Sequence, residues 1–247
     1  MYPPDGWHHF SPFGGLHLLM IIACALAIAA PSWLGRRLSK TAEPILRRAL
    51  AALAVCYWLF YVIWWNWHGV DWREGLPLHI CDINGLIAPY ALLSQQRWAR
   101  ATLYFWTAAL TTQAFIQPAL YAGPASLVFW TFWAAHTVIA ACAVYDIAVL
   151  GFRPGWADLV RAALASFAYA ALVVPVNAWL GGDYGFIGNP APDIAVPPFV
   201  LMLGPWPQRA IVLAALVPLG FVVVLLPWLI VRKRQRAHSK PSPLWGG

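Results

Sequence analysis

Seven apolar runs occupy most of this chain, and each approaches the length that a helix needs to cross a bilayer, about 20 residues. They cover residues 16–34, 49–65, 76–93, 101–117, 125–150, 162–180 and 210–231. The third run is short and contains Asp82, so it is the weakest of the seven together with the fourth. We therefore expect an all-α polytopic membrane protein, a single bundle of seven transmembrane helices over residues 1–247.

Composition excludes the soluble alternatives. Hydrophobic residues make up 61% of the chain and charged residues only 10%, with a mean hydropathy of +0.63. A soluble domain typically carries about 25% charged residues. These values exclude a soluble globular protein, a disordered tail and a nucleic-acid-binding domain, so no nucleic acid is expected as a partner.

The net charge of +7 is explained by topology. If the N-terminus lies outside, 14 of the 16 Lys and Arg residues fall in the inner loops and in a basic cytosolic tail, residues 232–247. Only Arg73 and Arg209 then lie outside. Since cytoplasmic segments are enriched in Lys and Arg, this distribution predicts an outer N-terminus and a cytosolic C-terminus.

Polar side chains within the runs are costly, since a charge at mid-bilayer costs roughly 2.5–3.5 kcal/mol on insertion scales. They are His17, His79, Asp82, Asn84, Gln113, Gln117, His136, Asp146 and Asn177. Asp146 lies near the inner end and is expected to be an interfacial carboxylate. The others lie in the outer half or somewhat deeper, and they predict a polar pocket that opens outward or into the outer leaflet.

Four cysteines are present, and none has CxxC spacing, which argues against zinc clusters and thiol-redox motifs. Cys24, Cys56 and Cys142 lie among Ala, Val and Leu, where a thiol packs as a small hydrophobe. Cys81 differs because Pro77 suits the first turn of a helix, and the N-terminal end of a helix favours a thiolate. Cys81 is therefore either a nucleophile or a packing residue.

Histidines supply the candidate bases. His136 lies midway along an apolar run and is either a hydrogen-bonding residue between helices or a general base for Cys81, which needs only proximity in space. His79 and Asp82 share a helix face, so Asp82 either orients His79 or caps the helix. Gln113 and Asn177 are candidates to orient the base or to donate to an oxyanion.

Several stretches together carry a resemblance to a known family. They are residues 76–81 (LPLHIC), 113–118, 132–136 (FWAAH), 177–184 and 203–207 (LGPWP). In these stretches and their order the chain resembles the YwaF-like bacterial integral membrane proteins, which are grouped with the eukaryotic transmembrane protein 164 acyltransferases. The resemblance implies acyl transfer between glycerophospholipids, with Cys81 carrying the acyl group and His136 assisting. It also implies a pocket-lining loop at Tyr184; Asp183 departs from the Asn that is frequent before this Tyr.

The leading hypothesis is thus an O-acyltransferase that moves a fatty acyl chain from a phospholipid to a lysophospholipid through a Cys81 thioester. A phospholipase of the same Cys–His chemistry, and a transporter or receptor with a polar midplane site, remain alternatives. No cofactor is expected, and the partners are membrane lipids. A metal site is the weakest alternative, drawn from the outer histidines His8, His9, His17, His68 and His79.

Two further expectations concern the membrane in which the protein lies and the long outer loop. The resemblance favours the bacterial inner membrane, with the site facing the outer leaflet. Residues 181–208 form an outer loop rich in Pro, Gly and large apolar side chains. Because exposed apolar surface is costly, we expect this loop to fold over the pocket, either as a lid or as a plug that only seals the bundle.

Overall fold

The structure is a computed structural model that describes residues 6–194 and 196–238, and this part of the chain is helical, with one isolated β-bridge between His9 and Ala122. Five helices are long and apolar enough to cross a membrane. They are α1 (Gly15–Gly35), α2 (Glu43–Trp65), α6 (Leu127–Ala148), α7 (Trp156–Leu180) and α9 (Gln208–His238). The chain is therefore an all-α, multi-pass membrane protein.

The third apolar run forms a shorter helix than predicted, α3 (Ile80–Ser94). Pro77 lies before this helix rather than in its first turn, which corrects the expectation from the sequence. The helix begins only after His79, whose backbone is extended at φ −65° and ψ 153°. Asp82 Oδ2 accepts a hydrogen bond of 3.0 Å from the His79 backbone N–H, and this contact caps the helix start.

The fourth run is interrupted. It forms α4 (Arg97–Trp106), a π-helical turn (Thr107–Thr111) and the short α5 (Gln113–Ile116). The Thr112 amide donates to the carbonyl of Thr107, five residues earlier, which is the hydrogen-bond pattern of a π-helix. Such turns occur frequently at functional sites. This turn lies at the level of the α3 start, because its last residue, Thr111, contacts Cys81.

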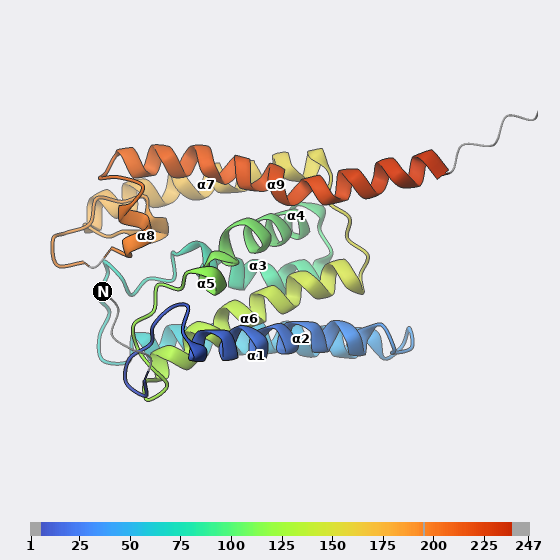
Figure 1. The fold of residues 1–247 in the computed structure, drawn as a ribbon, viewed down its shortest axis with the longest axis horizontal. Coiled ribbons are helices and arrows are strands. Elements are labelled where there is room, and N and C mark those ends of the chain that lie inside the picture. Colours follow the sequence, from blue (N-terminus) through green and yellow to red (C-terminus); the bar gives the residue numbers. More distant parts are fainter. Residues whose placement is uncertain (1–5, 195, 239–247) are drawn as a thin grey trace, which may run out of the picture.

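The helices form three layers (Figure 1). One layer holds α1, α2 and α6, the middle layer holds α3 and α4, and the opposite layer holds α7 and α9. Close packing joins α1 to α6, α2 and α6 to α3, α4 to α7, and the π-helical turn to α9. The middle layer is thus buried on both sides, which is why its short helices can start and stop within the bundle.

The two ends of the bundle differ in chemistry. The described residues of 181–208, with a 3₁₀ turn (Tyr184–Phe186) and α8 (Pro198–Leu201), lie at the same end as residues 6–14, and the basic end of α9 lies at the other (Figure 1). At that other end Arg100 pairs with Asp146 at 2.9 Å and Arg97 pairs with Asp158. Asp146 is buried in this pair rather than facing the interface. Of the predicted tail 232–247, residues 239–247 lie outside the described part.

Candidate functional site

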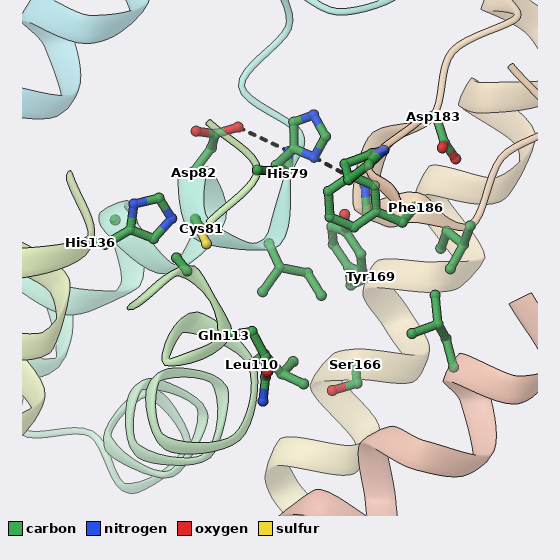
Figure 2. A pocket seen from close by; sticks show the side chains of 18 of the residues that line it. His79, Cys81, Asp82, Leu110, Gln113, His136, Ser166, Tyr169, Asp183 and Phe186 are labelled. Carbon is green, nitrogen blue, oxygen red and sulfur yellow. Dashed lines mark hydrogen bonds between the residues drawn. The ribbon is translucent and has the colours of Figure 1, made fainter. Parts of the chain in front are cut away.

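A cavity of about 1010 Å³ lies within the bundle, lined mostly by apolar side chains. Its polar residues come from several helices and include His79, Cys81, Asp82, Gln113 and His136. In Figure 2, Cys81 and His136 lie on the left of this pocket, and Ser166, Tyr169 and Phe186 lie to their right. Its size is at the upper end of the 300–1,000 Å³ typical of small-molecule sites.

Cys81 is the second residue of α3, so it lies in the first turn of that helix. Its thiol donates toward Thr111 Oγ1, with an S···O distance of 4.0 Å. Thr111 ends the π-helical turn, and the turn thereby brings a hydroxyl to the sulfur. All four cysteines are described, and Cys81 alone among them lines the cavity, whereas Cys24 and Cys142 are buried elsewhere and Cys56 is exposed.

His136 projects from α6 into the same cavity. Its Nδ1 lies 2.6 Å from the carbonyl oxygen of Phe132, and because a carbonyl only accepts, Nδ1 carries the proton. In a neutral ring Nε2 then holds the lone pair. A base for Cys81 on α6 requires α3 and α6 to be neighbours, and the two helices do pack together. Within the described residues no direct hydrogen bond joins Cys81 to His136.

The side chain of His79 contacts the outer loop. Its Nδ1 accepts a hydrogen bond of 3.4 Å from the Gly185 amide, and its ring packs against Tyr184 and Phe186. Asp82 accepts a hydrogen bond from the backbone of His79 and not from its ring. Of the two roles expected for Asp82, orienting His79 or capping the helix, the structure supports the cap. Trp58 Nε1 donates to the Asp82 carbonyl and ties α2 to this turn.

Gln113 and Asn177 have different positions. Gln113 opens α5 and lines the cavity. Asn177 is fully buried outside the lining, and its amide is spent on the loop: Nδ2 donates to the Tyr184 carbonyl and Oδ1 accepts from the Tyr184 amide, both at 2.9 Å. Both polar atoms of Asn177 thus bond the loop and the side chain lies outside the cavity lining, so Asn177 positions the loop.

Tyr184 is also a positioning residue. Its hydroxyl donates to the Trp72 carbonyl and accepts from the Leu76 amide, each at 2.9 Å. The side chain is fully buried. It thus joins the loop after α7 to the segment that precedes α3, and so holds the stretch that carries His79 and Cys81.

A buried ion pair anchors the same loop to α9. Arg209 Nη2 lies 2.9 Å from Asp183 Oδ2 and also donates to the Gly188 carbonyl. Burial raises the pKa of the Asp183 carboxyl, while the Gly188 amide and Arg209 act in the opposite direction. Arg209 is one of the two basic residues that the charge pattern left outside, and that exception is the sequence feature that could have pointed to this contact.

The loop forms part of the cavity wall. Its lining residues include Asp183, Gly185, Phe186, Ile187, Ile194, Pro197, Trp206 and Pro207. At the rim Arg73 pairs with Asp71 and Asp193 on the surface, and these contacts lower the pKa of both carboxyls. The expectation that residues 181–208 fold over the pocket is confirmed for the described residues of the loop.

Two further lining residues were not singled out from the sequence. Tyr169 donates from its hydroxyl to the Leu78 carbonyl at 2.8 Å, and Ser166 accepts from Trp106 Nε1 at 2.9 Å. Of the polar residues expected to converge, His17, Asn84 and Asn177 lie outside the lining. His17 instead bonds the Phe13 amide and the Phe115 carbonyl. Among the described residues no group of three or more His, Cys, Asp or Glu side chains is arranged to hold a metal ion.

Comparison with known proteins places the chain in a family. No curated protein and no solved structure matches it. The model of the TMEM164 family matches residues 7–230, which includes every helix and loop that lines the cavity. The chain belongs to the TMEM164 family.

Proposed function

We propose that this protein is a membrane-embedded O-acyltransferase that moves a fatty acyl chain from a glycerophospholipid to a lysophospholipid through a thioester on Cys81. The observation that carries the proposal is the shared cavity: a thiol in the first turn of α3 and a histidine with its Nδ1–H engaged by Phe132 line one apolar chamber. A nucleophile and an oriented base are the two parts that such chemistry requires.

In the first half-reaction the Cys81 sulfur attacks the ester carbonyl carbon of the donor. His136 Nε2 takes the thiol proton, directly or through one water. The C–O ester bond then breaks, the C–S thioester bond remains, and the proton passes from His136 to the oxygen of the departing lysophospholipid. Gln113, at the cavity wall, is the candidate donor to the carbonyl oxygen while it carries negative charge.

In the second half-reaction His136 Nε2 takes the proton of an acceptor hydroxyl. That oxygen attacks the thioester carbonyl, the C–S bond breaks, and the thiolate regains its proton from His136. The reaction needs no cofactor. An apolar cavity covered by residues 181–208 favours a lipid hydroxyl over water as the acceptor, because water entry is limited. Transfer is therefore proposed over hydrolysis.

The charge distribution of the sequence supports the placement of this reaction. We propose seven crossings, with the N-terminal segment outside and the C-terminal end of α9 in the cytosol. The described ends lie at opposite ends of the bundle, as an odd number of crossings requires (Figure 1). The loop end, and with it the cavity, then faces the outer leaflet.

A second candidate is a transporter or receptor that binds a lipid without reacting. The broken fourth run favours it, since interrupted helices with a central cavity are common in transporters. Both candidates predict lipid binding, but only the enzyme predicts loss of function on removing the sulfur.

The test uses the purified full-length protein in phosphatidylcholine vesicles with an isotopically labelled lysophospholipid, and mass spectrometry of the products. The wild type is expected to form labelled diacyl phospholipid, and Cys81→Ser to form none. Cys142→Ser, which removes a buried cysteine outside the cavity, is the matched control and is expected to retain transfer. Equal transfer by Cys81→Ser and the wild type would reject the thioester.

A further inference from the structure

We propose that the cleft between α7 and α9 is the acyl-chain site, and that a phospholipid chain enters it sideways from the membrane on its way to Cys81. The inference rests on the proposed function, because the chain it holds is the one to be transferred. It assigns a ligand, a fatty acyl chain, to a part of the cavity that lies away from the reactive side chains.

The cleft follows both helices for the same distance. Its wall on α7 runs from Ala163 to Val174, and its wall on α9 runs from Ala210 to Phe221. At a rise of 1.5 Å per residue each wall is about 16 Å long. An apolar cleft of this length can hold an extended hydrocarbon chain, and it belongs to the same cavity as Cys81 and His136.

The cleft opens toward lipid. Phe167 on α7 and Ile211 on α9 both line the cavity, yet they are 73% and 67% exposed. Both lie within helices that are long and apolar enough to cross a membrane. Side chains that line a cavity and also face outward mark its mouth, so this mouth lies in the plane of the bilayer rather than at the water surface.

The lower part of the cleft excludes a polar ligand group. The α7 wall carries two hydroxyls, and both are engaged. Ser166 accepts from Trp106 Nε1 at 2.9 Å and donates to the Ala162 carbonyl at 3.0 Å, and Tyr169 donates to the Leu78 carbonyl at 2.8 Å. At the deep end the fully buried Phe221 packs on Phe105, with ring centroids 5.3 Å apart. A headgroup in this part would lose its hydration without finding partners.

Apart from Asp82 at the start of α3, the charged side chains that line the cavity lie toward the outer loops, where Arg73, Glu74 and Asp183 contribute to its wall. A phospholipid would therefore lie with its headgroup at the loop end and one chain directed down the cleft to Phe221. This arrangement brings the ester, which joins the two parts, to the level of the α3 start. Phe221 would then limit the chain length that the cleft accepts.

Neighbouring alanines supply matched variants. Ala214 and Ala215 on α9 are both exposed, but only Ala214 lines the cleft. Tryptophan at 214 is expected to fill the cleft, whereas tryptophan at 215 faces lipid. On α7, Ala170 lines the cleft and the exposed Ala171 does not, which gives a second independent pair.

The experiment uses Cys81→Ser protein in phosphatidylcholine vesicles with a trace of phosphatidylcholine that carries a diazirine on its acyl chain. After irradiation, mass spectrometry is expected to locate cross-links in residues 163–174 and 210–221. Ala214→Trp should lower cross-linking inside the cleft about tenfold, a competition of about 1.4 kcal/mol, and Ala215→Trp should leave it unchanged. Ala170→Trp and Ala171→Trp should repeat this contrast.

Cross-links spread evenly over the lipid-facing sides of α1, α2, α7 and α9, unaffected by either cleft variant, would overturn the inference. Each variant is checked for a monodisperse elution profile, and the second pair decides if one variant fails to fold. Because the reporter is binding to a protein without the sulfur, the two proposals can fail separately. Cleft labelling together with transfer that does not need Cys81 would retain the cleft and reject the thioester.

Discussion

His136 Nδ1 donates a hydrogen bond of 2.6 Å to the carbonyl oxygen of Phe132, one turn earlier in α6. The bond fixes the ring orientation, and it assigns the lone pair of the neutral ring to Nε2. Phe132 also packs on the ring, with centroids 4.5 Å apart. A histidine held in this way is suited to accept a proton, and this supports the role proposed for it.

Removal of this base should slow acyl transfer with little effect on folding. His136→Phe keeps an aromatic ring between Phe115 and Phe132, and general-base loss typically costs about 10²–10⁴ in rate. Initial rates of labelled phospholipid formation measure the effect. The exposed His68, replaced by alanine, is the control and should have the wild-type rate. A His136→Phe protein with normal kcat would show that another group takes the proton.

The Thr111 hydroxyl should position the Cys81 thiol, because the Cys81 sulfur donates toward that hydroxyl. Thr111→Val keeps the shape and removes the acceptor, so kcat should fall by about threefold to tenfold, the equivalent of one ordinary hydrogen bond, while KM stays unchanged. The adjacent Thr112→Val is the control, because that hydroxyl donates to the Ala108 carbonyl of the π-helical turn and not to the thiol. Equal kinetics for the two variants would leave the Thr111 contact without a catalytic effect.

The loop should act as a lid if Phe186 limits water at the site. Phe186 lines the cavity and packs on His79, so Phe186→Ala opens the chamber next to the start of α3. We expect more free fatty acid relative to transferred chains, with normal expression. Quantification of both products in one reaction measures the ratio. A variant that merely unfolds would support a plug, and unchanged product ratios together with unchanged stability would contradict both roles.

The buried pair of Asp183 and Arg209 should be the strongest anchor of the loop. Asp183→Asn leaves the guanidinium buried without its counter-charge, and such a change typically costs about 3–5 kcal/mol. The melting temperature in detergent should fall clearly. Asp193→Asn, which breaks an exposed pair with Arg73, should hardly change it. Similar melting temperatures for the two variants would mean that the buried pair does not hold the loop.

The parts of the fold that depend on local pattern could be predicted from the sequence. The apolar runs located the long helices, since burial in a bilayer requires a continuous hydrophobic stretch. The start of α3 could not be placed in this way, because Asp82 caps the backbone of His79 and leaves Pro77 outside. The π-helical turn could not be predicted either, since its backbone pattern depends on packing in the middle layer and no residue type is specific to it.

Residues of the site could be predicted from the sequence, whereas the hydrogen-bond partners of those residues could not. The place of Cys81 near an expected helix start and the polar exception at His136 pointed to these two residues, which do line one cavity. Asn177 has the same exceptional character, yet its amide bonds the backbone of Tyr184. Partners such as Thr111 for Cys81 depend on how distant segments fold together, and that information is absent from composition and spacing.

The most direct measurement is the intact mass of the protein after incubation with phospholipid and no acceptor. The account predicts a gain of one acyl chain on the wild type, located on the peptide that contains Cys81, released by neutral hydroxylamine and discharged when lysophospholipid is added. Cys81→Ser should show no gain. Transfer that proceeds in Cys81→Ser, or an acyl group stable to hydroxylamine on another residue, would contradict the account.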